Sequence, residues 1–325
     1  MATEYYKNLY QSKVKKPITS AINDTQDSKQ VPLVLKEETE TAIMTQKSGK
    51  APGPDNITNE LLRISMSVIV PKLTNLFNVI IKTESIPEDW TKSTIVLLHK
   101  KGGKGDIGNY RPISLMSNIY EVFSKIILFR LSNNLEESQP KEQAGFRSNF
   151  WTIDHIHVLR QVLQKYREYN KVYYLGFMDF HEAFDSLEHQ YIWESLERQG
   201  VHAKYLRLLK IIYEKSTARI KLERTGEEFS IERGVCQGDP ISPKLFSTVS
   251  EMIFRRMSWE RCGWNVNGEN LSHLRFTDDL ALFSECPRAL KKMLQQLSDE
   301  SVNAGLSINV KNTKTMSTSQ SEEPI

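Results

Sequence analysis

The sequence contains little cysteine. Only Cys236, Cys262 and Cys286 occur among 325 residues, and no C-x-x-C pair is present. Three widely spaced cysteines cannot build the disulfide framework of a small secreted domain, and they lack the spacing of a zinc site. The cysteine content therefore indicates a protein of a reducing, intracellular compartment.

Long hydrophobic runs are missing as well. The N-terminus has no apolar segment of the kind that signal peptides carry, and no stretch reaches the length of a transmembrane helix. We therefore expect no membrane partner. The hydrophobic content of 39% is still enough to bury one large core or two smaller ones.

The sequence also lacks a strong net charge. Lys and Arg number 43 against 40 Asp and Glu, so the formal charge of +3 does not by itself indicate a nucleic-acid partner. The basic residues are nevertheless unevenly distributed, because residues 90–150 contain nine Lys and Arg against five Asp and Glu. Such a local excess is typical of contacts to a phosphate backbone, and equally of a solvated surface loop.

One short segment that predicts a β-hairpin contains a pair of carboxylates. Residues 273–283 read His-Leu-Arg-Phe-Thr-Asp-Asp-Leu-Ala-Leu-Phe, with two apolar runs around Asp278 and Asp279. Leu, Phe and Thr suit a half-buried strand, whereas Asp tolerates turn dihedrals. We therefore expect both carboxylates at the tip of the hairpin. Taken alone, an aspartate pair in a turn is more often simply solvated.

Another carboxylate follows a hydrophobic strand. Residues 172–178 are mostly apolar and lead into Asp179, after which the pattern becomes helical. A carboxylate at a strand end, next to a carboxylate-tipped hairpin, provides the oxygen ligands that Mg²⁺ prefers. Two such ions about 4 Å apart stabilise the attacking and leaving oxygens of an in-line phosphoryl displacement. The two segments together predict a nucleotidyl transferase.

Five motifs occur in an order that a known family shares. They are Gly145-Phe146-Arg147, Met178-Asp179-Phe180-His181-Glu182-Ala183-Phe184-Asp185-Ser186, Arg233-Gly234-Val235-Cys236-Gln237-Gly238-Asp239-Pro240-Ile241-Ser242-Pro243, Phe276-Thr277-Asp278-Asp279 and Ala304-Gly305-Leu306-Ser307-Ile308-Asn309. From about residue 50 to residue 316, the chain resembles the reverse transcriptase of non-LTR (LINE-type) retrotransposons, in particular the RTE-like group. The resemblance implies an α+β fold with the fingers and palm of a right-hand polymerase.

The resemblance also implies a division of the chain. We expect a polar N-terminal extension at 1–45, a fingers region at 46–170, a palm with the catalytic carboxylates at 171–318, and a tail at 319–325. The family's thumb and primer-grip hairpin are expected to be missing, because the sequence ends soon after the last motif. No endonuclease region is expected before the fingers.

By this resemblance, Asp179 and Asp278 are the principal ligands of two Mg²⁺ ions, for which Mn²⁺ can substitute. Asp279 and the carbonyl of Phe180 support them. The implied partners are an RNA template, a DNA primer and a dNTP, and an active enzyme of this kind is compatible with the nucleus.

The resemblance places six further residues around the incoming nucleotide: Lys100, Lys101, Arg111, Phe184, Gln237 and Gly238. A lysine of the pair and the arginine hold the triphosphate or the template, since a guanidinium matches phosphate oxygens. The phenylalanine crowds the 2′ carbon of the sugar, although a Phe on a first helical turn is as often a core residue. The Gln-Gly pair lines the nascent base pair.

The chain departs from the family after the last motif. The family carries a Lys before Thr313 that is a candidate for protonating the departing pyrophosphate, and this chain has Asn312 there. Lys311 and Lys314 are the remaining general-acid candidates, provided that the loop brings one of them within reach.

Two other functions stay open. The first is a catalytically inactive, truncated reverse-transcriptase remnant that only binds nucleic acid. The second is an RNA-templated RNA polymerase with the same palm, which Phe184 disfavours. The sequence does not indicate an oligomeric state.

Four local expectations complete the prediction. We expect a solvated tail at 1–36, a helix that begins at Pro71 and ends at Pro87, Asp239 as the N-cap of a helix that reaches about residue 257, and a strand at 305–309.

Overall fold

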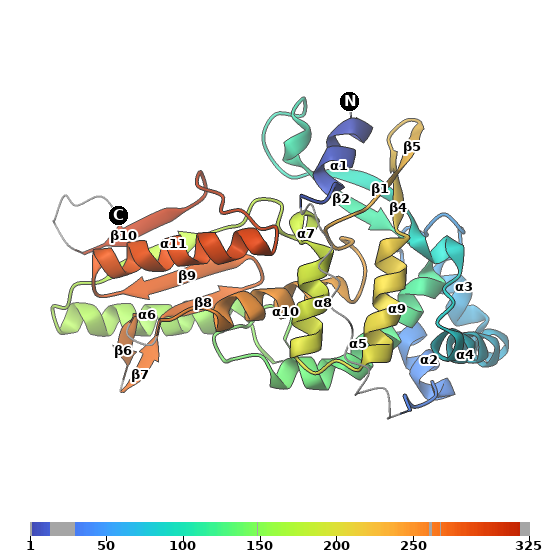
Figure 1. Ribbon diagram of the computed structural model, residues 1–325, viewed down its shortest axis with the longest axis horizontal. Helices are drawn as coiled ribbons and strands as arrows, with labels where there is room; N and C mark the ends of the chain where they lie inside the picture. Colours follow the sequence, from blue (N-terminus) through green and yellow to red (C-terminus); the bar gives the residue numbers. More distant parts are fainter. Residues whose placement is uncertain (1, 14–29, 148, 260–261, 267, 319–325) are drawn as a thin grey trace. The chain divides into compact units, whose positions relative to one another are not determined.

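The computed structural model describes residues 2–13, 30–147, 149–259, 262–266 and 268–318. The chain forms two compact units, of which unit 1 contains Met1–Leu135 and Phe184–Leu245, and unit 2 contains Glu136–Ala183 and Phe246–Ile325 (Figure 1). The chain enters each unit twice, so neither is one continuous stretch of sequence. The fingers and palm boundaries stay a prediction, and the expected tail at 319–325 lies outside the described residues.

Unit 1 combines helices with a four-stranded sheet. Its helices are α1 (Ala2–Tyr10), α2 (Lys36–Met44), α3 (Asn59–Ile64), α4 (Met66–Thr83), most of α5 (Asn118–Glu137), α8 (His189–Arg198), α9 (Ala203–Glu214) and the short η2 (Glu88–Thr91) and η3 (Ile107–Asn109). Its strands are β1 (Lys92–His99), β2 (Tyr110–Leu115), β4 (Thr217–Lys221) and β5 (Thr225–Ser230). The sheet order is β2-β1-β4-β5, in which β1 and β4 run parallel.

Aromatic side chains fill part of the core of unit 1. The ring centroid of Trp90 lies 6.1 Å from that of Phe77, 5.9 Å from that of Tyr120 and 5.3 Å from that of Phe123. Tilted pairs at this separation add to the stability that burial of the rings provides. They join α4, α5 and η2 in one cluster.

The N-terminal helix α1 belongs to the core of unit 1, so the expectation of a solvated tail was wrong for this segment. Tyr6 and Tyr10 are 1% and 3% exposed, and they pack with Ile220 of β4 and Phe229 of β5. Two tyrosines four residues apart lie on one face of a helix, which gives α1 an apolar stripe.

Helix α4 runs through Pro71 instead of beginning at it. A proline lacks the backbone N–H, so it removes one hydrogen bond near the start of this helix. The buried side chains of Leu73 and Phe77 hold the helix on the core despite that loss. The helix ends at Thr83, before Pro87, because the next residue, Glu84, adopts a left-handed φ of 54°.

Unit 2 is built around a second sheet, in the order β10-β3-β9-β8. Its strands are β3 (Tyr174–Met178), β8 (His273–Phe276), β9 (Asp279–Ser284) and β10 (Lys314–Ser317), with a separate pair β6 (Trp264–Val266) and β7 (Glu269–Leu271). Its helices are α6 (Thr152–Glu168) and α11 (Pro287–Asn303), while α7 (Ala183–Ser186) and α10 (Ser242–Arg255) lie where the chain passes between the units.

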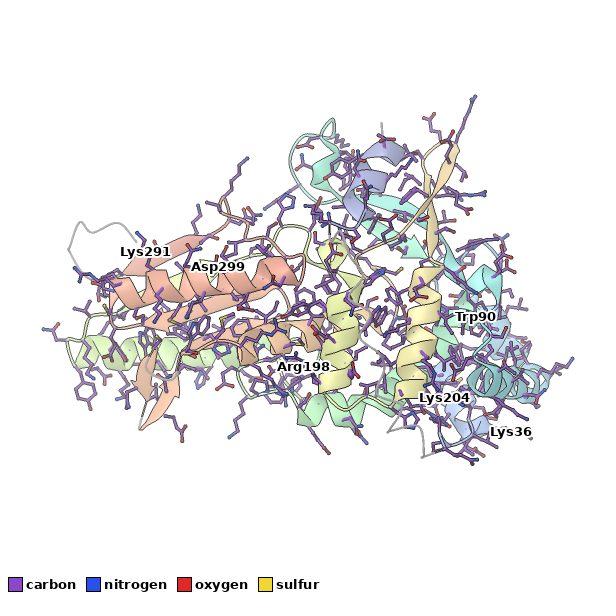
Figure 2. All side chains as sticks on the ribbon, in the orientation of Figure 1. Lys36, Trp90, Arg198, Lys204, Lys291 and Asp299 are labelled. Atoms are coloured by element: carbon purple, nitrogen blue, oxygen red, sulfur yellow. The ribbon has the colours of Figure 1, made fainter. Side chains whose placement is uncertain are left out.

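Helix α11 begins at Pro287 and buries Leu290 and Met293, whereas Lys291 and Asp299 are exposed (Figure 2). The strand expected at 305–309 was wrong, since this segment forms a single bridge, between Phe180 and Ile308, and the strand β10 comes later. Among the described residues, no helix combines the length and the apolar character needed to cross a membrane.

Candidate active site

Strands β3 and β9 bring two of the predicted carboxylates to the same end of the unit 2 sheet. The strands are antiparallel, and Met178 lies opposite Leu280. Asp179 directly follows Met178, and Asp279 directly precedes Leu280, so the two aspartates come next in the same register. The hydrophobic runs of both strands therefore fix the position of the carboxylates.

The predicted hairpin is present as β8 and β9. Phe276 pairs with Asp279, so the turn consists of Thr277 and Asp278, and Asp279 is the first residue of β9. Thr277 has a φ of 63°, in the left-handed region that a β-branched residue rarely adopts. Two-residue hairpin turns need such dihedrals, so this tight turn holds Asp278 beside the strand ends at the expense of a strained threonine.

Asp179 and Asp279 influence each other electrostatically. Burial raises the pKa of Asp279, and the negative charge of Asp179 raises that pKa further. A divalent cation between them would relieve the repulsion, and carboxylate oxygens are the hard donors that such an ion prefers. Within the described parts of the chain, no group of three or more His, Cys, Asp or Glu side chains is arranged to hold a metal. The carboxylates of Asp179 and Asp279 form a pair of oxygen donors, which fits a divalent ion.

Asn312 contacts this site directly. Its Nδ2 donates a hydrogen bond to Oδ2 of Asp179 at 2.9 Å, and the backbone N–H of Asn309 donates to the Asp179 carbonyl at 2.8 Å. Lys311 and Lys314 are exposed, and Lys314 lies opposite Phe177 in the pairing of β10 with β3. The side chain that bonds the Asp179 carboxylate is therefore the Asn312 amide, which cannot act as a general acid.

A segment before α6 supports the hairpin. The N–H of Arg275 donates to the carbonyl of Glu142 at 2.8 Å, and the N–H of Ala144 donates to the carbonyl of Arg275 at 3.0 Å. A Cβ on Gly145 would lie 2.3 Å from the backbone nitrogen of Thr277. The glycine of the Gly-Phe-Arg motif therefore allows this segment to pack against the turn that contains Asp278.

A buried ion pair lies under the same hairpin. Nη2 of Arg275 donates to Oε2 of Glu251 at 2.7 Å, and both side chains are almost completely buried. The guanidinium carbon also lies 4.2 Å from the ring centroid of Phe254. Burial lowers the pKa of Arg275, while the Glu251 carboxylate raises it. The pair connects β8 to α10 within unit 2.

In unit 1, Gln237 and Gly238 lie against strand β2. The N–H of Ser114 donates to the carbonyl of Gln237 at 2.8 Å. Gly238 has a φ of 126°, and a Cβ there would lie 2.8 Å from the carbonyl oxygen of Ser114. The backbone itself therefore requires a glycine at this position, in addition to the nucleotide contact that the sequence predicts.

The predicted phosphate-binding cations lie on the β1–β2 arm of unit 1. Arg111 pairs with Leu98 in the register of these strands, and Lys100 and Lys101 follow β1. All three cations are exposed. The N–H of Lys100 donates to the carbonyl of Asn109 at 2.8 Å, which closes the loop between the two strands.

Phe184 and Asp185 lie on the short helix α7. The Phe184 ring is half-buried, and its carbonyl accepts a hydrogen bond from the N–H of Val235 at 2.8 Å. Asp185 is only 2% exposed, and it accepts hydrogen bonds from Oη of Tyr10 at 2.8 Å and from Nε2 of Gln237 at 2.6 Å. Asp185 thus belongs to the surroundings of Gln237.

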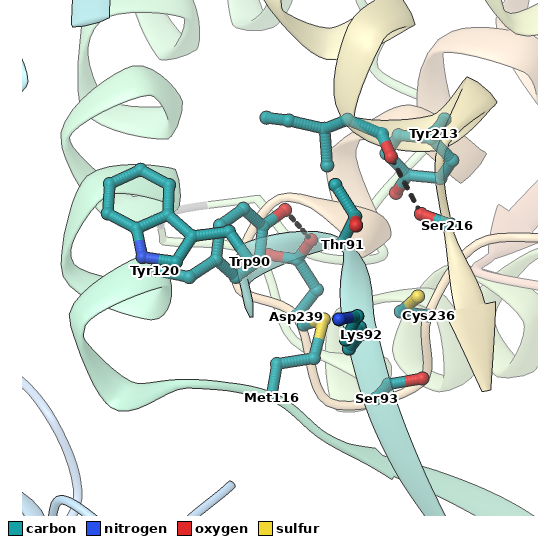
Figure 3. Close-up of a pocket in the computed structure, with 11 residues that line it drawn as sticks. Trp90, Thr91, Lys92, Ser93, Met116, Tyr120, Tyr213, Ser216, Cys236 and Asp239 are labelled. Carbon is teal, nitrogen blue, oxygen red and sulfur yellow. Dashed lines mark hydrogen bonds between the residues drawn. The ribbon is translucent and has the colours of Figure 1, made fainter. Parts of the chain in front are cut away.

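A small cavity lies beside the motif that contains Gln237, and its lining includes Trp90, Tyr120, Cys236 and Asp239 (Figure 3). It offers about 10 Å³ to the centre of a water molecule, enough for a single water. Burial raises the pKa of the Cys236 thiol to about 12. The thiol therefore stays neutral, which fits a packing role.

Asp239 is not the N-cap of the following helix, because α10 begins at Ser242. Its carboxylate accepts a hydrogen bond from Oη of Tyr120 at 2.7 Å (Figure 3). It accepts another from Oγ of Ser124 at 2.5 Å. Burial raises the pKa of Asp239, and these two hydroxyls lower it. The two hydroxyl partners of Asp239 lie on α5, more than a hundred residues earlier in the sequence.

Three contributors were missed in the sequence: Tyr10, Glu251 and the contact of Asn312 with Asp179. Glu251 is the single acidic residue of helix α10, and this isolation was the available signal. Tyr10 gave a weaker one, since tyrosine is common at surfaces as well as in cores.

The chain matches the family model described as "Reverse transcriptase (RNA-dependent DNA polymerase)" over residues 98–323. It is 29% identical over 249 residues to the Retrovirus-related Pol polyprotein from type-1 retrotransposable element R2 of Nasonia vitripennis, covering 76% of this chain and 24% of that protein. It is 31% identical over 221 residues to the Probable RNA-directed DNA polymerase from transposon X-element of Drosophila melanogaster, covering 66% of this chain and 24% of that protein. The chain thus spans about a quarter of the length of these relatives.

Among solved structures, the fold is similar to apo telomerase from Candida Tropicalis truncated from its C-terminal domain. The TM-score is 0.57 at 17% identity, over 82% of this chain and 57% of that chain. The expected α+β polymerase fold is thereby confirmed. With the family model matching more than two thirds of its length, the chain belongs to the reverse transcriptase (RNA-dependent DNA polymerase) family and is similar to the proteins of non-LTR retrotransposable elements.

Proposed function

We propose that this chain is the RNA-directed DNA polymerase domain of a non-LTR retrotransposon. The observation that carries the proposal is the pairing of β3 with β9, whose last pair, Met178 with Leu280, directly precedes Asp179 and directly follows Asp279. Asp278 lies in the adjoining turn. The proposed substrates are an RNA template, a DNA primer and a dNTP. We propose that the reaction takes place inside the cell, in the nucleus, where DNA primers are available.

The carboxylates are proposed to hold Mg²⁺, with Mn²⁺ as a substitute. Asp179, Asp278 and Asp279 would supply side-chain oxygens, and Phe180 its carbonyl. Bound divalent ions supply charge stabilisation to the attacking 3′-oxygen and to the departing pyrophosphate. Burial, and then the negative charge of Asp179, raise the pKa of Asp279. This supports the assignment, because a site of two unshielded carboxylates favours cations.

The residues of unit 1 are proposed to bind the nucleotide. The exposed cations Lys100, Lys101 and Arg111 would contact phosphate oxygens, for which a guanidinium fork and ammonium groups are suited. The half-buried Phe184 would crowd the 2′ carbon of the sugar and favour dNTPs. Gln237 and Gly238 would line the nascent base pair. The division into fingers at 46–170 and palm at 171–318 is part of the same proposal.

Primer extension tests this function. The chain is incubated with a primed RNA template, dNTPs and Mg²⁺ or Mn²⁺, in parallel with the Asp278→Asn variant and an Asp299→Asn control. Asp299 is exposed on α11, so the control removes the same charge away from the catalytic turn (Figure 2). We expect extension by the parent and the control only, with a loss of at least about a hundredfold in Asp278→Asn.

Template binding is measured on the same three proteins. A parent that binds the template but does not extend the primer would favour an inactive, nucleic-acid-binding remnant. Extension with ribonucleotides in place of dNTPs would favour an RNA polymerase instead.

A further inference from the structure

A buried chain of hydrogen bonds joins the N-terminal helix α1 to Gln237 within unit 1. Oη of Tyr10 donates to Oδ1 of Asp185 at 2.8 Å, and Nε2 of Gln237 donates to Oδ2 of Asp185 at 2.6 Å. We propose that Tyr10 and Asp185 are positioning residues that hold the Gln237 amide in one orientation for the incoming nucleotide. This inference rests on the proposed nucleotide contact of Gln237.

The carboxylate determines which end of the amide faces it. An ionised carboxylate only accepts hydrogen bonds, so the NH₂ group of Gln237 must point toward Asp185. The amide oxygen and the second N–H are then directed elsewhere and are the groups that a nucleotide can meet. Because the Gln237 carbonyl is also bonded to the N–H of Ser114 at 2.8 Å, both the backbone and the side chain of this residue are held.

Hydrogen bonds connect the end of helix α1 to the segment that leads into Gln237. The carbonyl of Tyr10 accepts hydrogen bonds from the N–H groups of Glu232 at 3.0 Å and Arg233 at 3.1 Å. Nε of Arg233 also donates to the carbonyl of Leu9 at 2.7 Å. The Tyr10 ring stacks on Phe229, with centroids 6.2 Å apart. The end of α1 therefore holds the Tyr10 hydroxyl in place relative to the segment that leads into Gln237.

The Tyr10 phenol keeps its proton, and with it the ability to donate a hydrogen bond, at neutral pH. Burial is the main factor that raises the pKa of Tyr10 well above its usual value, and the charge of Asp185 raises it further. Without this donor, one oxygen of a buried carboxylate loses the Tyr10 hydroxyl as a partner, and the carboxylate can rotate toward Gln237. The Gln237 amide would then no longer be restricted to one orientation.

Kinetics of single-nucleotide incorporation test the inference. Tyr10→Phe removes the hydroxyl and keeps the ring that packs on Phe229. We expect the KM for dNTP to rise about tenfold, equivalent to about 1.4 kcal/mol, with kcat changed by less than about twofold. Tyr166→Phe is the matched control, because it removes a tyrosine hydroxyl that bonds another carboxylate, Glu285, in unit 2 at 2.5 Å. Its KM should equal that of the parent.

A double-mutant cycle separates positioning from a general loss of stability. If Tyr10 acts through Gln237, then Tyr10→Phe leaves the KM unchanged in a Gln237→Ala background. An unchanged KM in Tyr10→Phe alone, or the same increase in both backgrounds, overturns the positioning role.

A spectroscopic readout does not depend on catalysis. In protein with ¹⁵N-labelled Gln side chains, the Gln237 amide signal is identified by its absence in Gln237→Ala. We expect Tyr10→Phe to shift this signal and Tyr166→Phe to leave it in place, whereas an unchanged signal in Tyr10→Phe overturns the inference. A parent chain that extends no primer overturns the proposed function, and the amide signal alone then decides whether the hydrogen-bond chain exists.

Discussion

Asn312 occupies the position at which a general acid would protonate the pyrophosphate that leaves in the proposed reaction. Its amide donates to Asp179 at 2.9 Å but has no proton to give to a departing pyrophosphate. We predict that Asn312→Lys raises kcat about tenfold, since a placed general acid contributes about a hundredfold or more when ideally positioned. The new lysine should also add a decline of kcat at alkaline pH, as its ammonium group deprotonates. Single-nucleotide incorporation measured against pH checks both effects.

Asn303→Lys is the control for this substitution. Asn303 is the exposed last residue of α11, so a lysine there adds the same charge without contact to Asp179. Its kcat should match that of the parent. If Asn312→Lys does not exceed this control, then protonation of the leaving group does not limit the reaction.

His189 makes the stability of unit 1 dependent on pH. Its Nε2 donates to the carbonyl of Gly234 at 2.8 Å, and burial lowers its pKa to about 4. Below its ordinary pKa of about 6.5, the unfolded chain binds a proton that the folded chain does not bind. The stabilisation from neutral His189 is therefore complete above pH 6.5 and is lost as the pH falls toward 4, on the order of 3 kcal/mol in total.

We predict that His189→Gln, which keeps a donor for Gly234, weakens this pH dependence. Urea unfolding at several values between pH 7 and pH 4 should show a smaller loss of unfolding free energy in the variant than in the parent. The exposed His157→Gln substitution serves as the reference. Parallel curves for parent and His189→Gln would show that His189 is protonated in the folded protein.

At the scale of elements, the β8–β9 turn, which contains Asp278, depends on a close backbone approach. A Cβ on Gly145 would lie 2.3 Å from the backbone nitrogen of Thr277, and backbone cannot move aside as a flexible side chain can. We predict that Gly145→Ala lowers the unfolding free energy by about 1–3 kcal/mol and reduces primer extension more than tenfold. Gly103→Ala is the matched control, because a Cβ there meets no atom within 4 Å. Equal extension by the two variants would contradict the packing argument.

The elements that carry the carboxylates could be predicted because their signals are local. A hydrophobic run that ends at Asp179, and two runs around Asp278, determine the strands and the turn within a few residues. The contacts of Tyr10 with Asp185 and of Arg275 with Glu251 join segments that are far apart in the sequence. No local pattern reports such a pair. The same holds for Pro71, where tertiary packing of α4 outweighs the local preference of proline for a helix start.

At the scale of the whole molecule, the resemblance of ordered motifs predicted the family and the α+β fold, both of which the comparisons confirm. The two compact units were not predicted, because they interleave along the chain. Hydrophobic patterning reports how far a residue is buried but does not report which distant segment buries it. The assignment of fingers and palm therefore stays a prediction.

Because the net charge is only +3, affinity for a nucleic acid must come from a local cluster of cations. We predict that replacing Lys100, Lys101 and Arg111 by Gln weakens template binding and reduces its salt dependence. Each phosphate contact on a single strand contributes about 0.7 to the slope of log K against log salt, so the slope should fall by about 2. The control replaces Arg288, Lys291 and Lys292, three exposed cations of α11, and removes the same total charge. Fluorescence anisotropy of a labelled RNA template over a range of salt concentrations measures both slopes. An equal decrease in the two variants would show that overall charge, and not the β1–β2 arm, governs binding.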